Sequence, residues 1–572
     1  MRNKLEFTLD PEDLFLDPWR EEGVSLVSEP DFIWREHPAA TIEGFAVSAH
    51  DAINRKIHSF TEVTRKQKKF GKALWFNAAP VVVRDVEFRK SQILSSGRFI
   101  LKGAAGTRAI NGFRFESEAT EGEPEEALNA YFAQCREKNA GRALPVATPS
   151  PDAPIAIECR NTFNYYHFIT ESLAQLALFD GLTEGRDIFF HYPNEDDKQR
   201  DFVRDFVEAL FPETTGRVFF ERSPKSYPEA LTGFEMISAQ LQAPADSALD
   251  SLIPRHIRNR LGGMSVEMQP LLQMNAVSES LLALRDRALR AIEGQDFSHL
   301  PTRFFIGRRD DHARARPMAR QERLLEHLEL FGFEEIAFED YPPLEQIALM
   351  ARAEIVIGAH GAGLTNMLFA HPDAQVIELG TLQTAQFRWA DFWPLAHASQ
   401  CRYISFFADF NTDDPLKEPH FATDGIVPVA LSDAAIAQIL SYVVSVLGHV
   451  PELPSARTVE ALARRLLRAG LAEQALALLD RHEDVIKGDA DFFLLRGDCH
   501  KALAEPKSEL VAIDQAFKAD PTRWQTLIRI IWCAHHCDRP QVIRWALSRL
   551  ERDFPERHAA FVGNHDWVRF VA

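Results

Sequence analysis

The sequence contains little cysteine and no long apolar segment. Six cysteines are spread over 572 residues, which is typical of a reduced protein and not of a disulfide-stabilised secreted domain. No uncharged run approaches the roughly 20 residues that a membrane span requires, and no apolar stretch near residue 1 resembles a signal peptide. We therefore expect a cytoplasmic protein without a transmembrane segment.

The sequence also lacks an excess of positive charge. Lys and Arg number 64 against 83 Asp and Glu, which gives a net charge of -19. Such a charge opposes binding to nucleic acid or to an anionic membrane unless a strong basic patch is present. The one basic cluster, residues 65–72, is explained better as a solvated turn than as a binding patch. We therefore expect no nucleic-acid partner.

The chain is too long for a single hydrophobic core. A Pro-rich stretch at residues 145–151 and the prolines at 451 and 454 are its clearest candidate linkers. We predict four regions in an α/β protein: a mixed, β-rich region at 1–150, Rossmann-like domains at 151–300 and 301–450, and an all-helical region at 451–572.

Strand-like and helix-like segments alternate through both central regions, which indicates parallel sheets covered by helices. In the first region, the apolar runs lie at residues 156–159, 187–191 and 217–220. In the second, strands are predicted at residues 303–307, 335–338, 354–358 and 375–379, with helices at 321–330, 343–353 and 364–370. Two such units joined by a helix at 279–293 match the GT-B plan, in which the ligand binds between the units.

The last region is predicted to be a short array of helical repeats. Gly497, Ala516 and Pro521 stand at the spacing of the small and proline positions of a tetratricopeptide (TPR) repeat, and Pro555 follows Pro521 by the 34-residue period of that repeat. An irregular helical appendage explains the same residues about equally well. If the array forms, it could dock a protein partner.

The most informative segment is the glycine-rich turn after the strand at 354–358. A strand that turns through glycines directly into a helix leaves amide N–H groups without intrahelical partners, and these can bind an anion. Gly361 and Gly363 leave room for a diphosphate. A simple tight turn is the competing explanation. The candidate binding residues are His360, Gly361, Ala362, Gly363, Leu364, Thr365 and Asn366.

Two further features favour a nucleotide diphosphate as the ligand. Arg308 and Arg316 follow the strand at 303–307, and arginine forks over two phosphate oxygens. Glu378 lies within an apolar strand, where a buried carboxylate needs partners; a ribose diol or a buried arginine would supply them.

Residues 305–379 resemble the signature block of glycosyltransferase family 61. The shared elements are the arginines after a strand, Gly332-Phe333, the 345–347 segment, the glycine turn with Phe369, and the 376–379 strand. Residues 164–168 with Glu171 resemble the family's other block. One departure is Arg320-Gln321-Glu322, where the family commonly has Asn-Glu.

The resemblance implies an inverting GT-B enzyme that uses a nucleotide-diphosphate sugar, usually a UDP-sugar, without a cofactor or metal. The acceptor would be a glycan or a related molecule, in polysaccharide biosynthesis. Asn164, His167 and Glu171 are three and four residues apart and share a helical face. We predict His167 or Glu171 as the catalytic base, with Asn164 and Tyr166 orienting the acceptor. Packing of these aromatic residues into the sheet is the alternative.

Other functions remain open from the sequence alone. The chain could be a non-catalytic scaffold whose helical tail docks partners, or an epimerase that acts on the same donors. Cys533 and Cys537 could suggest a metal site, but two further ligands are missing, and a packed helix explains them better.

Overall fold

The computed structural model describes most of the chain in two compact units. The first unit comprises the described parts of residues 1–46, 50–318 and 333–429, and the second comprises those of 47–49, 319–332 and 430–572. The described residues are 16–17, 19, 22–68, 71–89, 92–99, 130–131, 134–135, 137–139, 142–159, 164–192, 201–236, 274–307, 318–412, 414, 417–447, 456–483 and 488–570.

The first sheet of the first unit is mixed, in the order β10-β9-β8-β11-β5-β6-β7 with β1 beside β5. Its parallel strands are β8 (Ile155–Glu158), β9 (Ile188–Tyr192) and β10 (Val218–Arg222). The others are β11 (Lys225–Glu235), β5 (Ala78–Arg89), β6 (Gln92–Ser95), β7 (Arg98–Phe99) and β1 (Val24–Leu26). Because β11 pairs parallel to β8 and antiparallel to β5, it joins the two halves.

A helix at residues 165–179 follows β8 and is built from four short pieces. They are α5 (Tyr165–His167), a π-helical turn η1 (Phe168–Leu173), α6 (Ala174–Leu176) and η2 (Ala177–Phe179). The helices α7 (Asp201–Leu210) and η3 (Pro212–Thr214) connect β9 to β10. Strand and helix therefore alternate from β8 to β10, as the sequence predicts.

The second sheet is parallel along β14-β13-β15-β16-β17. These strands are β14 (Glu334–Ile336), β13 (Arg303–Ile306), β15 (Ile355–Ala359), β16 (Gln375–Thr381) and β17 (Arg402–Phe410). From β13 the chain runs outward to β14 and then returns to the other side as β15. The direction of winding therefore reverses between β13 and β15, where parallel sheets open a crevice at their carboxyl ends.

The connections of this sheet are mostly helical. They include η5 (Phe338–Asp340), α14 (Pro343–Ala351), η6 (Ala362–Phe369), α15 (Leu382–Phe387), η7 (Trp389–Phe392) and α16 (Trp393–Ser399). The predicted helix at 364–370 is thus a 3₁₀ helix that begins at Ala362. After β17 come α17 (Phe421–Asp424) and β18 (Val429–Ala430).

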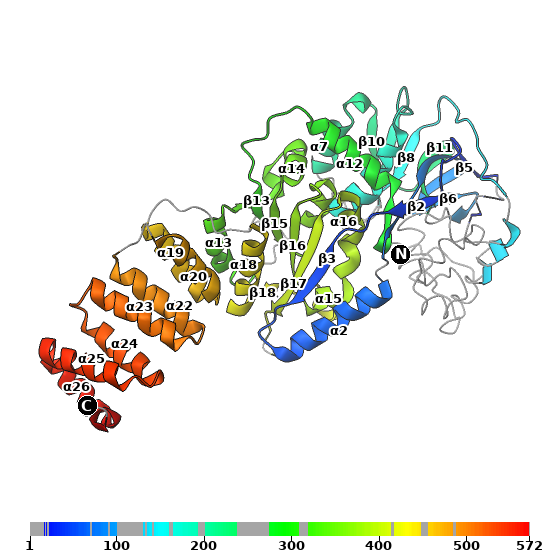
Figure 1. Cartoon of the computed structure of the whole chain (residues 1–572). Helices are drawn as coiled ribbons and strands as arrows, with labels where there is room; N and C mark the ends of the chain where they lie inside the picture. Colours follow the sequence, from blue (N-terminus) through cyan, green and yellow to red (C-terminus); the bar gives the residue numbers. More distant parts are fainter. Residues whose placement is uncertain are drawn as a thin grey trace. The chain divides into compact units, whose positions relative to one another are not determined.

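Strands from residues 1–150 enter both large sheets. β3 (Ile42–Ala46) pairs parallel with β17, far along the chain, and Figure 1 shows it beside that strand. A third, small sheet combines β2 (Trp34–His37) and β4 (Ala73–Phe76) with β12 (Ala276–Ser278). The helices α2 (Asp51–Lys68) and α12 (Glu279–Ile292) complete this unit, and α12 confirms the predicted helix at 279–293.

The second unit is helical. It contains α13 (Gln321–Leu328), η4 (Glu329–Phe331), α18 (Asp433–Leu447), α19 (Ala456–Arg468), α20 (Ala472–Arg481), α22 (Ala490–Ala502), α23 (Pro506–Ala519), α24 (Trp524–His536), α25 (Pro540–Asp553), α26 (Pro555–Asn564) and η8 (Asp566–Phe570). The fold class is therefore mixed α/β with parallel sheets, followed by a run of helices. None of the described helices is long and apolar enough to cross a membrane.

Two helix pairs in this array repeat at a constant interval. α22 begins at residue 490 and α24 at residue 524, which is 34 residues later. α23 begins at residue 506 and α25 at residue 540, again 34 residues later. A Cβ on Gly497 would lie 3.1 Å from Ile513 Cγ1, so this glycine allows α22 to approach α23 closely. Cys533 lies in the apolar core of the array, and among the described residues no three His, Cys, Asp or Glu side chains form a group that could hold a metal.

Candidate active site

The glycine turn, residues 360–366, lies at the carboxyl end of β15, beside the point where the winding of the second sheet reverses. His360, Gly361, Ala362 and Gly363 are half-buried, and the residues after them are buried. The first N–H groups of a 3₁₀ helix have no intrahelical acceptor. The amides of Ala362 and Gly363, at the start of η6, are therefore candidates to bind an anion.

Packing against the sheet explains why residue 363 is a glycine. A Cβ at this position would lie 3.1 Å from Ile306 Cγ2 and 3.9 Å from a ring carbon of Phe338. The absent side chain therefore faces the sheet, and glycine allows the turn to pack against Ile306. The sequence prediction attributed it to the approach of a ligand.

Two residues of the turn are less accessible than the sequence suggests. Thr365 and Asn366 are both 0% exposed. The side-chain oxygen of Asn366 accepts a hydrogen bond from Tyr165 at 2.5 Å, and its amide nitrogen donates to Gln346 at 3.4 Å. Asn366 consequently stabilises the turn, whereas the buried Thr365 hydroxyl has no hydrogen-bond partner among the described residues. That the two side chains supplement the amides as donors stays a prediction.

Glu378, on β16, is the buried carboxylate behind the turn. Its side chain is fully buried, and His360 Nδ1 lies 2.5 Å from its Oε1. Its Oε2 accepts hydrogen bonds from the hydroxyls of Tyr403 at 2.6 Å and Ser405 at 3.0 Å. Burial, followed by the charge of Glu378, raises the pKa of Tyr403 and keeps it a neutral donor. The partners of this carboxylate among the described residues are therefore a histidine, a tyrosine and a serine, and not the arginine that the sequence offers as one explanation.

These contacts fix the orientation of His360. Because Nδ1 faces Glu378, the other ring nitrogen, Nε2, points away from the carboxylate. The side chain of His360 is 9% exposed, and its ring lies 5.4 Å from that of Phe392, so the imidazole is held on more than one side. A carboxylate that faces one ring nitrogen of a histidine sets its tautomer and its orientation.

The 165–179 helix supplies the second part of the site. His167 Nδ1 lies 2.8 Å from Glu171 Oε1, and the two side chains are 18% and 24% exposed. The intervening turn is π-helical, a geometry that is frequent at functional sites. Asn164 precedes the helix and makes no side-chain cap. The predicted contact between His167 and Glu171 is therefore present, and both side chains are partly exposed.

Tyr165 connects this helix to the glycine turn. Its hydroxyl donates to Asn366 Oδ1 at 2.5 Å and lies 3.2 Å from Gln346 Oε1. Its ring packs against Phe202 and Phe206 of α7, at centroid distances of 5.3 and 5.8 Å. Burial raises the pKa of Tyr165, so its hydroxyl remains a donor. The carboxyl ends of the two large sheets are thereby joined by a hydrogen bond.

Tyr166 makes a second connection. Its hydroxyl donates to the backbone carbonyl of Asp391 at 3.2 Å, and its ring lies edge-on to Phe392 at 5.8 Å. The other neighbour of Phe392 is His360, at 5.4 Å. The ring of Phe392 thus contacts both Tyr166 and His360.

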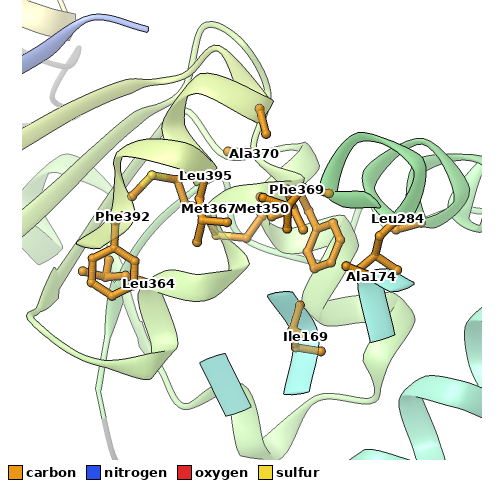
Figure 2. Close-up of a cluster of buried hydrophobic side chains, with 14 of the residues drawn as sticks. Ile169, Ala174, Leu284, Met350, Leu364, Met367, Phe369, Ala370, Phe392 and Leu395 are labelled. Carbon is orange, nitrogen blue, oxygen red and sulfur yellow. The ribbon is translucent and has the colours of Figure 1, made fainter. Parts of the chain in front are cut away.

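An apolar cluster underlies both connections. It extends from Leu364, Met367 and Phe369 of η6 to Ile169 and Ala174 of the 165–179 helix, and Figure 2 shows Phe392 at its end near Leu364. Close-packed apolar side chains resist small displacements. The cluster therefore holds the His167–Glu171 face and the glycine turn in a fixed relation.

The polar residues that meet in the structure are not all those that the sequence predicts. Arg308 and Arg316 lie outside the described residues. The structure adds six residues that sequence reasoning did not place in the site: Tyr165, Gln346, Arg388, Asp391, Tyr403 and Ser405. Tyr403 and Ser405 alternate along the strand next to Glu378, a pattern that could have identified partners for that carboxylate.

Comparison with known proteins gives one family match. Residues 165–377 match the family described as Glycosyltransferase 61. No curated protein matches the chain. Among solved structures, the chain is similar to MamA, with 11% identity over 22% of this chain and 69% of that one and a TM-score of 0.18. It is also similar to MamA 41-end from Desulfovibrio magneticus RS-1, with 12% identity over 22% of this chain and 67% of that one and a TM-score of 0.18.

Proposed function

We propose, from the premise that residues 165–377 form a glycosyltransferase family 61 domain, that this domain transfers a sugar from a nucleotide-diphosphate donor, such as a UDP-sugar, to a glycan or related acceptor with inversion. The observation that carries the proposal is that two polar centres, one from each large sheet, lie on segments joined by the hydrogen bond from Tyr165 to Asn366. His360, backed by Glu378, belongs to the glycine turn on one sheet. His167, paired with Glu171, belongs to the helix that follows a strand of the other.

The glycine turn is proposed to bind the diphosphate. As the bond to the anomeric carbon breaks, negative charge accumulates on the leaving diphosphate, and fixed donors aimed at it lower the barrier. The amides of Ala362 and Gly363 are such donors, and His360 donates from Nε2 when its imidazole carries both ring protons. With Arg308 and Arg316 as predicted cations, these groups can neutralise the diphosphate, which supports a metal-independent reaction.

The His167–Glu171 pair is proposed to activate the acceptor. Inversion requires the acceptor hydroxyl to attack from the face opposite the diphosphate, so the base must lie across the crevice from the glycine turn. With Glu171 at His167 Nδ1, the ring nitrogen proposed to take the proton of the acceptor hydroxyl is Nε2. Asn164 and Tyr166 flank this face and would orient the acceptor. Glu171 could also act directly, and the variants described in the Discussion separate the two assignments.

The remaining parts of the proposal concern the architecture and the setting. Two sheets with strand-helix alternation, linked by the hydrogen bond from Tyr165 to Asn366, support a GT-B-type arrangement of domains at 151–300 and 301–450. The 34-residue interval of the helix starts supports a TPR-like array at 451–572, with a protein partner as its expected ligand. All six cysteines are free thiols, which supports a cytoplasmic role in polysaccharide biosynthesis.

The first test is a panel of nucleotide sugars. We expect UDP or a UDP-sugar to raise the melting temperature of the protein, because a ligand that binds only the folded state stabilises it. Mass spectrometry should then detect the sugar on an added glycan acceptor. No stabilisation by any member of the panel would contradict donor binding. An altered free donor without transfer would indicate an epimerase.

A further inference from the structure

An aspartate that sequence reasoning did not single out lies at the edge of the candidate site. Asp391 belongs to η7, a single turn that follows β16 and α15. Its neighbours Trp389, Ala390 and Phe392 are buried, whereas the side chain of Asp391 is 36% exposed. An apolar turn that packs into the core therefore presents one polar side chain in a fixed position.

Contacts place this aspartate between the two polar centres. Its backbone carbonyl accepts the hydrogen bond from Tyr166, and the ring of the next residue, Phe392, contacts His360. Burial raises the pKa of Asp391, and the electrostatic influence of Arg388, followed by that of His360, opposes the rise. Asp391 thus lies close enough to His360 to interact with it electrostatically, and it belongs to the candidate site.

The two oxygens of this carboxylate have different surroundings. Oδ2 lies 3.0 Å from Arg388 Nη1, whereas no described residue donates a hydrogen bond to Oδ1. The side chain of Arg388 is 43% exposed, and a guanidinium carries five N–H donors. An acceptor beside a donor suits two adjacent hydroxyls of a sugar ring, because one hydroxyl can donate to Asp391 while its neighbour accepts from Arg388.

We propose that Asp391 and Arg388 bind adjacent ring hydroxyls of the sugar carried by the nucleotide donor, and so determine which sugar is transferred. This inference rests on the proposed function, since it takes the glycine turn as the site of the diphosphate. The transferred sugar is bonded to that diphosphate and must lie beside the turn. Both η7 and the turn belong to the second sheet, whereas the proposed acceptor groups belong to the 165–179 helix.

The test is a comparison of two ligands on the Asp391→Asn variant. Isothermal titration would measure the Kd of UDP and of the UDP-sugar that stabilises the wild-type protein most. We expect the Kd of UDP to stay within about twofold. The Kd of the UDP-sugar should rise about 10- to 100-fold, the range for losing a hydrogen bond to a charged group. The preference for that sugar over its hydroxyl epimers should fall.

A matched control makes the same chemical change elsewhere in the sheet. Asp373→Asn alters an aspartate that is 95% exposed and precedes β16, and it should leave both Kd values unchanged. An unchanged ratio of the two Kd values in Asp391→Asn would overturn the inference. So would a higher KM for the acceptor alone, which would assign the pair to the acceptor. Failure of the wild-type protein to bind UDP would instead overturn the proposed function.

Discussion

Replacing His167 with alanine is expected to lower the rate of sugar transfer by about 10²–10⁴-fold, the usual contribution of a positioned general base. Donor affinity should change little, because the glycine turn belongs to the other sheet and keeps all of its contacts. The measurement is kcat with a saturating acceptor, together with the Kd of UDP from titration. The loss should therefore appear in kcat and not in donor binding.

Two further variants define the role of each member of the pair. If Glu171 only orients His167, Glu171→Gln retains a hydrogen-bond acceptor for Nδ1 and should lower kcat less than His167→Ala does. If Glu171 is itself the base, the order reverses. His299→Ala is the matched control, since His299 Nε2 lies 3.8 Å from Glu345 in an exposed His–Glu pair. Activity that survives His167→Ala largely intact would contradict the assignment of His167.

Replacing Glu378 with alanine is expected to lower the free energy of unfolding by about 3–5 kcal/mol. This is the usual cost of removing one member of a buried, hydrogen-bonded ion pair. His360, Tyr403 and Ser405 would all lose their hydrogen-bond partner at once. The measurement is urea-induced unfolding followed by tryptophan fluorescence, which reports on the buried Trp389 and Trp393 of the same unit.

The control for this variant is a carboxylate in the neighbouring strand connection. Glu354 lies 2.7 Å from Arg303 but is 43% exposed, so Glu354→Ala should cost at most about 1 kcal/mol. Glu378→Gln keeps an acceptor for the hydroxyls and should be more stable than Glu378→Ala, yet it should still weaken UDP binding, because His360 loses its carboxylate. Equal stability of Glu378→Ala and Glu354→Ala would contradict the role of Glu378.

The local pattern of the second sheet could be predicted because its strands are buried on both faces. Such strands form apolar runs, and their ends are marked by glycine or proline; Gly332, for example, closes the helix at 321–331 with a φ of 76°. The turn after β15 was recognisable for the same reason. Strand order was harder, since β3 pairs with β17 across more than 350 residues of chain, and nothing in a five-residue strand specifies so distant a partner.

The site was predictable where its residues are neighbours in sequence and not where they meet only in space. His167 and Glu171 are one helical turn apart, so their contact follows from the spacing. The link from Tyr165 to Asn366 spans 201 residues, and Tyr165 could equally have been a packing residue. Asp391 follows no motif, and only its position between Tyr166 and His360 distinguishes it from a surface aspartate.

The most direct test of the central claim is an experimental structure of the protein with UDP bound. The account predicts that the diphosphate oxygens lie within about 2.7–3.2 Å of the amide nitrogens of Ala362 and Gly363 and of His360 Nε2. The ribose should then lie on the second sheet, and the His167–Glu171 face should remain open to an acceptor. UDP bound away from the glycine turn, with His360 making no contact to it, would contradict the account.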